Sequence, residues 1–428
     1  MTESFEPPVG DPPVPPHLPE PPRRATVAFI FVTILIDVLA MGLVIPILPP
    51  LVKSFVGGDT AHAAEWIGIF GTAWSAMQFI CSPILGSLSD HFGRRPVILA
   101  ANFGLGLDFI LMALAPSIPW LFAGRIISGI TGASFTTAWA YIADVTPPEK
   151  RAAGFGVVGA AWGTGFILGP ALGGLLGSIS PRLPFWIAAT LALVNVCYGF
   201  FVLPESLPSS KRTAFSWRRA NPIGSLALLR RHRELLGLAA VFFLYYFALQ
   251  AMQSTLVLSS IHRYGWSQRS VGFMLSTMGV AALVVQGLLV SRTVARFGER
   301  RAMLIGLTFG ILGEAIFGLA PTGLLFCLGI PVLSMQGLTN PSIQGLMTRR
   351  VSPGEQGKLQ GANTSLIGLT GLIGPGVFAF TFAHFIRPHR GWTLPGAPFL
   401  LASLVLMVAL AIAARVTRIP DASKAPVH

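Results

Sequence analysis

Apolar residues run along this chain in blocks of about 20, separated by shorter polar segments. A block of that length is what an α-helix needs to cross about 30 Å of hydrocarbon. The pattern predicts an all-α polytopic membrane protein, and its even number of spans puts both chain ends on one side. The twelve predicted spans lie near residues 26–51, 66–88, 97–116, 119–142, 152–178, 184–203, 236–260, 270–290, 302–320, 323–346, 360–382 and 396–414.

Basic residues indicate which side of the bilayer the chain ends occupy. Of the 30 Lys and Arg residues, 23 lie in the tails or in segments on the same side as the tails, and six lie on the other side. Positive residues are retained on the cytoplasmic side, so both termini are predicted to be cytoplasmic. The same distribution accounts for the net charge of +13. Since no basic stripe or base-stacking module accompanies the charge, the lipid bilayer is the expected partner and nucleic acid is not.

Three polar segments frame the spans. Residues 1–25 are proline-rich and lack an apolar core, which predicts an extended, disordered cytoplasmic tail with a partner-docking role as the alternative. Residues 204–235 are predicted to form a basic cytoplasmic linker, with a short amphipathic helix around 222–233, and a lipid contact there is the alternative. Residues 417–428 form a second cytoplasmic tail. The predicted six-helix bundles are then residues 26–203 and 236–416.

Composition argues against an enzyme or a metalloprotein. Only 11% of the residues are charged and 53% are hydrophobic, whereas a soluble domain carries about 25% charged residues. Cys81, Cys197 and Cys327 each fall inside an apolar block, so they are expected to be packing residues and not a disulfide or metal framework. No nucleophile elbow, zinc spacing or phosphate loop occurs, and no appended domain is large enough for signalling.

The two halves of the chain resemble each other at an offset of about 205 residues. DHFGRRPVIL at 90–99 matches ARFGERRAML at 295–304, and FILGPALGG at 166–174 matches GLIGPGVFA at 371–379. ADVTPPEKR at 143–151 matches RRVSPGEQG at 349–357. Such a duplication predicts two pseudo-symmetric six-helix bundles that rock around a substrate site near the midplane.

Five segments carry a resemblance to the major facilitator superfamily, and within it to the tetracycline/proton antiporters. GSLSDHFGRRP after the second span, GRIISGITGAS in the fourth and GFILGPALGG in the fifth resemble superfamily signatures, the last of them typical of exporters. LIDVLAMGLVIPILP in the first span and KLQGANTSLIGLTGLIGP before the eleventh resemble the tetracycline group. One departure concerns the substrate: some of these exporters have an eighth-span histidine where this chain has Ala282. The sequence therefore leaves open whether the ligand is a tetracycline–magnesium chelate or another compound.

The junction after the second span is predicted to be a gating latch. A carboxylate beside two guanidiniums can pair and hold a helix end in one conformation, and glycines permit a close approach and the turn. The alternative is a positive anchor with a turn, which would not need the aspartate. The second half keeps Phe297 and Gly298 but has Ala295 in place of the aspartate, so the latch should be asymmetric. The latch residues are Gly86, Asp90, Gly93, Arg94 and Arg95.

Small residues line one side of the fifth span. Their three- and four-residue spacing lets helix backbones approach closely, and the proline kinks the helix. The prediction is a conformational hinge and seal, with plain packing as the alternative. The residues are Gly165, Gly169, Pro170, Gly173 and Gly174, and the eleventh span repeats the motif as Gly374–Pro375.

Asp37, Asp108 and Glu314 lie within apolar spans, where an ionised carboxylate costs roughly 2.5–3.5 kcal/mol. Each must therefore face water, a partner or a proton, and we expect them to carry proton coupling at the interface of the halves. Asp37 and Asp108 match acids of the tetracycline group, whereas Glu314 lies about a turn from that group's ninth-span acid. Arg125 in the fourth span is expected to pair with a protonatable acid, for coupling or as a structural bridge.

Amides inside the spans are candidate ligand-binding groups together with Asp37. Interhelical hydrogen bonds are the alternative role. The amides proposed for substrate binding are Gln78, Gln250, Gln286, Asn340 and Gln344, with Gln336 as a further polar span residue. The aromatic residues Phe79, Trp139, Trp162 and Tyr246 could stack on a flat ligand or pack helices.

These features predict a proton-coupled antiporter that exports tetracycline-like or other small organic drugs by alternating access. The alternative is a proton symporter for an endogenous metabolite, which the exporter-type fifth span disfavours. The expected coupling ion is the proton, with no cofactor and no protein-bound metal, although the substrate could arrive as a magnesium chelate. The chain is expected to act as a monomer in a bacterial inner membrane.

Overall fold

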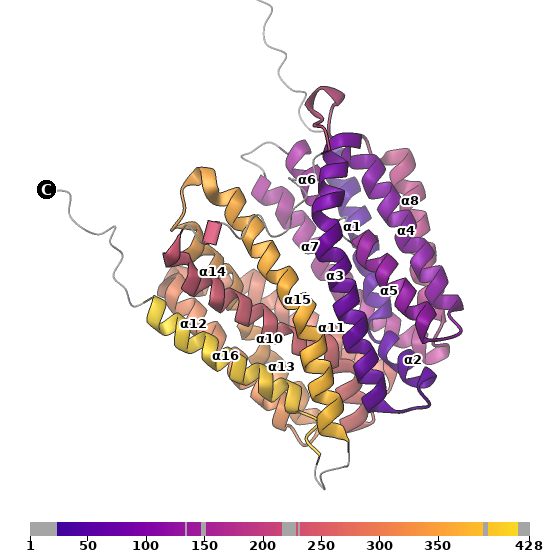
Figure 1. Ribbon diagram of the computed structural model, residues 1–428, viewed down its shortest axis with the longest axis vertical. Helices are drawn as coiled ribbons and strands as arrows, with labels where there is room; N and C mark the ends of the chain where they lie inside the picture. Colours follow the sequence, from indigo (N-terminus) through magenta and orange to yellow (C-terminus); the bar gives the residue numbers. More distant parts are fainter. Residues whose placement is uncertain are drawn as a thin grey trace, which may run out of the picture.

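The computed structural model describes residues 24–132, 135–146, 151–215, 228–229, 232–387 and 393–417. In these segments the regular secondary structure is helical, as the spacing of apolar blocks predicts. Figure 1 shows two groups of helices, α1 to α8 and α10 to α16, with α3 and α15 running side by side between them. The predicted tail 1–25 lies outside the described residues up to position 23. Most of the predicted linker helix around 222–233, at residues 222–227 and 230–231, and residues 418–428 also lie outside them.

Four of the six predicted spans of the first half are single helices. The first span is divided into α1 and α2, and the fourth into α5 and α6. The predicted first span, 26–51, is divided because α1 ends at Val44 and α2 begins at Leu48, where Pro46, Pro49 and Pro50 remove backbone donors. The helices are α1 (Arg24–Val44), α2 (Leu48–Phe55), α3 (Thr60–Phe92), α4 (Arg94–Leu114), α5 (Ile118–Gly132), α6 (Phe135–Val145), α7 (Arg151–Ile179) and α8 (Leu183–Val202).

The second half repeats this order. Two of its spans contain irregular turns: a π-helical turn follows α11, and a 3-10 turn separates α13 from α14 just before Pro341. The helices are α10 (Arg233–Tyr264), α11 (Gln268–Val284), α12 (Val290–Leu319), α13 (Gly323–Ser334), α14 (Thr339–Thr348), α15 (Gln356–Ile386) and α16 (Ala397–Val416).

Ten helical stretches within the described residues are long and apolar enough to cross a membrane. One of them, Gln268–Leu319, has 52 residues and takes in two predicted spans, which separate at Gly298. The predicted fourth span, 119–142, is covered by α5 and α6 on either side of residues 133–134. The twelve-span architecture is therefore confirmed.

Gly93 and Gly298 make equivalent turns in the two halves. Their φ angles are 106° and 77°, a region that only glycine enters at little cost, and they lie 205 residues apart. Both turns lie at the end of the bundle where α8 ends and α10 begins. We call this end the linker side and the opposite end, which holds α2, the far side.

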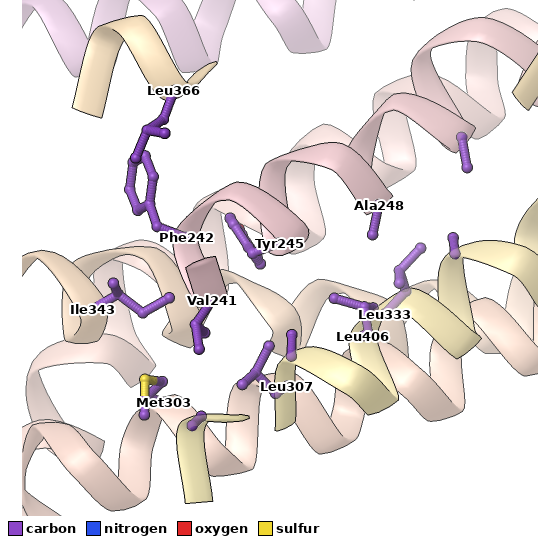
Figure 2. Packing of buried hydrophobic residues seen from close by; sticks show 14 of the residues in the cluster. Val241, Phe242, Tyr245, Ala248, Met303, Leu307, Leu333, Ile343, Leu366 and Leu406 are labelled. Atoms are coloured by element: carbon purple, nitrogen blue, oxygen red, sulfur yellow. The ribbon is translucent and has the colours of Figure 1, made fainter. Parts of the chain in front are cut away.

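Each half has its own buried core. The core of the second half joins helices α10 to α16, and Figure 2 shows Phe242 and Tyr245 of α10 among its members. The first half buries apolar residues of α1 to α5 and α8. Four residues of the second half, Leu258, Phe382, Ala383 and Ile386, belong to that first-half core. The two bundles are therefore joined by apolar packing.

Candidate functional site

The first contact between the halves is the crossing of α3 and α15. A Cβ added to Gly68 would lie 2.7 Å from the Cβ of Ala379, and one added to Gly71 would lie 2.8 Å from the Cβ of Pro375. Backbones approach this closely only where small residues face each other. Farther along the same helices, Gly371 faces Ser75 and Gly368 faces the ring of Phe79. The crossing thus extends from the far side towards the middle of both helices.

The second contact between the halves joins α7 to α11. A Cβ on Gly174 would lie 3.0 Å from the Cα of Gly272, and the Ser276 hydroxyl donates to the Ile167 carbonyl oxygen at 2.5 Å. An ion pair joins Arg387 and Glu65 at 2.5 Å on the far side. Two helix crossings and an ion pair therefore seal the far side.

The glycines of the same helices have different surroundings on the linker side. Gly86 at the end of α3 and Gly159 near the start of α7 have open space where a side chain would stand, and Gly357 at the start of α15 does as well. The expectation that Gly86 serves a close approach is therefore wrong for this conformation. Among the described residues, these three positions therefore contact nothing on the linker side, whereas the halves are joined on the far side.

The small residues of α7 face two different helices. Gly165, Gly169 and Gly173 face α1, where a Cβ on Gly169 would lie 2.7 Å from the Cα of Gly42. Gly174 faces α11 of the other half, and so does the carbonyl group of Pro170, which a Cβ on Gly272 would meet. The glycines that face α1 thus pack two helices of the same half together. Gly174 and Pro170 lie at the contact between the halves, where a seal was predicted.

The predicted latch residues meet at the linker side of the first half. Arg94 pairs with Asp90 at 2.5 Å and with Asp144 at the end of α6 at 3.1 Å, and its guanidinium donates to Ser89 Oγ at 2.6 Å. Only 11% of the Arg94 side chain is exposed. Arg94 therefore ties three helix ends of the first half together.

Glu205, which lies just after α8, completes this cluster. Its carboxylate accepts hydrogen bonds from the backbone N–H groups of Arg94 at 2.8 Å and Arg95 at 3.3 Å, at the start of α4. A carboxylate at a helix N-terminus is stabilised by the unpaired N–H groups and the helix dipole. The Arg95 guanidinium donates to the Phe200 carbonyl and lies over the Phe200 ring. Arg95 thus anchors α8, and Arg94 is the residue that holds the acids.

The second half has a pair at the same place with its charges exchanged. Glu299, directly after Gly298, lies 3.1 Å from Arg349 at the end of α14. These positions are 205 residues after Arg94 and Asp144. Because Ala295 replaces the aspartate, the second half has a single exposed pair where the first has a cluster. The predicted asymmetry of the latch sequence is visible in these contacts.

Asp37 lies inside the first half. Its carboxyl accepts a hydrogen bond at 2.8 Å from the Asn195 amide of α8, and the same amide donates to the Thr33 carbonyl at 3.0 Å. The side chain of Asn102 on α4 lies beside the carboxyl. Asp37 is 6% exposed. The groups nearest to the carboxyl are therefore two amides, of which Asn195 donates the hydrogen bond.

Asp108 and Arg125 form the intramembrane ion pair that the sequence suggests. Asp108 Oδ2 on α4 lies 3.6 Å from the Arg125 guanidinium on α5, and the carboxyl is fully buried. A Cβ on Gly124 would lie 2.7 Å from Asp108 Oδ1, so the glycine makes room for the acid. The Arg125 guanidinium also contacts Met112 Sδ at 3.0 Å. The charges compensate each other inside the bundle.

Glu314 of α12 is fully buried, and neither of its carboxyl oxygens has a hydrogen-bond partner among the described residues. Glycines of α12 pack closely on α13, where a Cβ on Gly313 would lie 2.5 Å from the Cα of Leu333. An ionised carboxylate without a partner is very costly in such surroundings. No described residue therefore compensates a negative charge on Glu314.

The three acids lie within the halves and not between them. α4 packs on α5 and α8, α12 packs on α13, α14 and α16, and the Asp37 carboxyl is directed to α4 and α8. The expectation that they lie at the interface of the halves is therefore wrong. Any coupling through them must act through helix packing within one bundle, and their part in coupling stays a prediction.

The candidate amides fall into two groups. Gln78 packs against Gly132, Gln250 is 8% exposed and packs against Gly374, and Gln336 is 3% exposed beside Gly310. On the linker side of the second half, Gln344 donates to Asn340 at 2.9 Å and lies 3.5 Å from Gln360 of α15. The first group takes part in helix packing, whereas the second forms a partly exposed amide chain.

Gln286 is exposed within the π-helical turn Val285–Leu289. Such turns are uncommon and often occur at functional sites. Of the aromatic candidates, Phe79 packs on α15 and Tyr246 packs on the rings of Phe242 and Tyr245. Trp139 and Trp162 each make a side-chain interaction. Gln286 is thus the candidate amide that remains most accessible.

Several site residues were not singled out by sequence reasoning. Asn102 and Asn195 carry the same signal as the glutamines, an amide within an apolar block, and could have been found by it. Asp144 lies in a repeated segment, ADVTPPEKR, that attracted attention for its symmetry alone. Glu205 had no sequence signal, because its role depends on the fold bringing residue 205 to the start of α4.

No group of three or more His, Cys, Asp or Glu residues in the described part of the chain is placed to hold a metal ion. Outside the spans, Glu355 lies 3.0 Å from the Ser352 hydroxyl and 3.3 Å from His232. The hydrogen bond from Ser352 first, and then the contact with His232, lowers the pKa of the Glu355 carboxyl.

Comparison with known proteins extends this picture. The family model of the Major Facilitator Superfamily matches residues 30–375 and 262–427. A tetracycline resistance protein of class C from Escherichia coli is 35% identical over 371 residues, which cover 86% of this chain and 93% of that protein. The structure of the human organic anion transporter MFSD10 (TETRAN) is similar with a TM-score of 0.69 and 28% identity, over 92% of this chain and 100% of that one. The nucleoside transporter NupG shares the fold with a TM-score of 0.73 at 16% identity, over 92% of this chain and 100% of that one.

Proposed function

The chain belongs to the Major Facilitator Superfamily, and from that premise we propose that it is a proton-coupled antiporter exporting tetracycline-like or other small organic drugs. It is a multi-pass membrane transporter and not an enzyme, since its family and its structural neighbours are transporters. The observation that carries the finer proposal is the 35% identity to the class C tetracycline resistance protein over most of both chains. A proton-driven metabolite symporter is the alternative outcome of the test below.

The proposed transport cycle alternates between two arrangements of the halves. The far side is sealed where α3 meets α15 and α7 meets α11, and the linker side is open at Gly86 and Gly159. We assign the linker side to the cytoplasm, because the positive segments lie there. The described conformation then admits substrate from the cytoplasm. Export requires the linker side to close and the far side to open.

Protons supply the driving force in this proposal. One proton moving inward gains about 2.3 kcal/mol per 100 mV of membrane potential. Asp37, Asp108 with Arg125, and Glu314 are the proposed coupling groups because each is a buried carboxyl that binds or releases a proton only with a change in its surroundings. Since they lie inside the bundles, proton uptake acts on the contacts between α1, α4, α5 and α8, and on α12.

The substrate site is proposed to be an amide-rich region between the halves. Gln286, Asn340 and Gln344 are accessible or partly accessible, while Gln78 and Gln250 lie at helix contacts near the seal. Amides donate and accept hydrogen bonds, which suits a ligand rich in keto and hydroxyl groups. Asp37 is buried, so a substrate role for it would require α1 to move. A magnesium chelate remains a proposed substrate form, with magnesium as cargo.

Gating is proposed for both linker-side pairs and the far-side glycines. Asp90, Arg94 and Arg95 hold the first half's ends together, and Gly174 with Pro170 forms part of the seal. We further propose that the protein works as a monomer in a bacterial inner membrane with both termini cytoplasmic.

Inside-out membrane vesicles test the direction of transport. Respiration acidifies their interior, so an antiporter accumulates tetracycline, and a protonophore abolishes the accumulation. A metabolite symporter would instead lose its substrate from acidified vesicles. Absence of proton-driven drug uptake in vesicles that contain the folded protein would overturn the antiport proposal.

A resistance profile tests the substrate class. The chain is expressed in a pump-deficient bacterium and challenged with tetracyclines, fluoroquinolones, chloramphenicol and dyes. Protection is expected against tetracyclines, and loss of protection in Asp37→Asn is expected at equal membrane levels of protein. Protection against none of these compounds would overturn the substrate assignment.

A further inference from the structure

The carboxyl group of Asp37 is held by side chains from two other helices, and this arrangement carries an inference that rests on the proposed function. Asn195 on α8 donates one N–H to Asp37 Oδ1 at 2.8 Å and one to the Thr33 carbonyl at 3.0 Å. The Asn102 side chain on α4 lies beside the same carboxyl. All four residues are buried, with 6% exposure or less. Together with Thr33 and Asp37, the amides thus form a polar cluster inside the first bundle.

The cluster offers donors to a carboxylate and acceptors to a carboxylic acid. The two N–H groups of Asn195 serve the charged form, as a carboxylate only accepts hydrogen bonds. Asn195 Oδ1 and Thr33 Oγ1 have no hydrogen-bond partner among the described residues. Thr33 precedes Asp37 by four residues on α1, so both side chains lie on one face. A protonated Asp37 therefore has acceptors beside it for its O–H.

Among the described residues of the neighbouring helices, no charged side chain is paired with the Asp37 carboxyl. Asp37 receives amides from α4 and α8, and α7 faces α1 with Gly165, Gly169 and Gly173. Tyr141 of α6 packs near Ile34 and Val38, and its hydroxyl donates to the Pro204 carbonyl. Neutral amides are therefore the groups that respond to the proton on Asp37.

We infer that Asn195 and Asn102 are positioning residues for the proton on Asp37, and that Asn195 transmits the protonation state to the contact between α1 and α8. When Asp37 is charged, Asn195 holds both the carboxylate and the Thr33 carbonyl. When Asp37 gains a proton, Asn195 can accept from the acid only by turning its oxygen towards α1. The same turn removes the N–H from the Thr33 carbonyl and loosens α8 from α1.

The test measures the pH dependence of transport for Asn195→Leu and Asn102→Leu in inside-out vesicles. Loss of a hydrogen bond to the charged carboxylate should move the pH midpoint of drug–proton exchange up by about one pH unit, a tenfold change in proton concentration. Asn195→Asp should move it in the same direction, since it adds a like charge. Asn363→Leu is the matched control, because Asn363 is an equally buried amide on α15 in the other half.

A second readout separates positioning from folding. Asn195→Leu should reduce proton-driven accumulation about tenfold while energy-independent exchange of labelled drug across the membrane falls less than about threefold. An unchanged pH midpoint and equal losses in both assays would overturn the inference and leave the antiport proposal standing. If the wild-type protein shows no proton-driven transport, the proposed function fails instead. A variant that fails to fold is recognised by its absence from the membrane, and Asn102→Ser then replaces it.

Discussion

Arg349 lies 3.1 Å from Glu299, the same separation as between Asp144 and Arg94, which lie 205 residues earlier in the chain. The acid and the base have exchanged places between the halves. In each half, the ion pair joins the start of the third membrane span to the end of the fourth. Both copies of the duplicated unit therefore keep an ion pair at this place. The difference lies in surroundings, because Arg94 is 11% exposed and Arg349 is 75% exposed.

That difference in exposure predicts unequal effects of removing the two arginines. Arg94→Gln leaves Asp90 and Asp144 without their cation and should reduce transport at least about tenfold, which corresponds to about 1.4 kcal/mol. Arg349→Gln removes an exposed pair worth about 0–1 kcal/mol, so its transport should stay within about threefold of wild type. Initial rates of drug uptake in vesicles, normalised to protein, provide the measurement.

The exchanged charges supply a control for this comparison. Glu299→Arg alone places two cations together and should lower the rate, and the additional change Arg349→Glu should restore it. Equal losses for Arg94→Gln and Arg349→Gln would show that exposure does not decide the strength of these pairs.

The far-side seal predicts a position-dependent effect of adding one methyl group to α7. Gly174→Ala would push against Gly272 and the Gln268 carbonyl of α11, and such overpacking typically costs about 1–3 kcal/mol. Because the contact exists only when the far side is closed, the variant should favour far-side opening. A cysteine at Gln268, in a chain with Cys81, Cys197 and Cys327 changed to Ser, should react faster with an impermeant thiol reagent added on that side.

Gly159→Ala is the matched control on the same helix, since nothing lies within 4 Å of a Cβ at Gly159. Its thiol reactivity should equal that of the parent chain. Identical reactivity in Gly174→Ala and Gly159→Ala would argue that the α7–α11 contact does not seal the far side.

The fold could be predicted from the sequence because the bilayer imposes helix length and positive charge imposes sidedness. The glycine turns at Gly93 and Gly298 were marked by a repeated motif, and Arg125 with Asp108 by being charged residues inside apolar blocks. The break between α1 and α2 was missed because the first apolar block runs through Pro46 without a polar residue.

A pattern of apolar blocks does not predict which neighbouring helix a given side chain faces. Asp37 was expected at the interface of the halves, yet its carboxyl is directed to α4 and α8. A span with polar or small residues on several faces does not reveal which face meets which neighbour. Glu205 was hidden for a related reason, as its contact with Arg94 spans 111 residues of sequence.

A pH-dependent contact is predicted at the start of α15. The pKa of the Glu355 carboxyl is lowered from its ordinary value of 4.5, chiefly by the hydrogen bond from the Ser352 hydroxyl. At pH values above 4.5 the charged carboxylate therefore stabilises this turn. That stability is lost as the pH falls through the lowered value. Ser352→Ala should move the loss to higher pH, measured as hydrogen exchange of the backbone amides of residues 356–359. Ser178→Ala is the control, because the Ser178 hydroxyl donates to a backbone carbonyl; an equal shift there would contradict the assignment.

The acids Asp108 and Glu314 occupy similar places in the two halves, but neutralising them should change Tm by very different amounts. Asp108→Asn leaves the Arg125 guanidinium buried without its carboxylate, a change that typically costs about 3–5 kcal/mol and should lower Tm by on the order of 5–10 °C. In the second half Ile330 stands where the repeat would place the arginine, so Glu314→Gln removes no ion pair and should leave Tm within about 2 °C. Thermal unfolding in detergent measures both. Restoring stability to Asp108→Asn by adding Arg125→Leu would identify the stranded cation as the cause, whereas a large loss in Glu314→Gln would mean that Glu314 is ionised and paired.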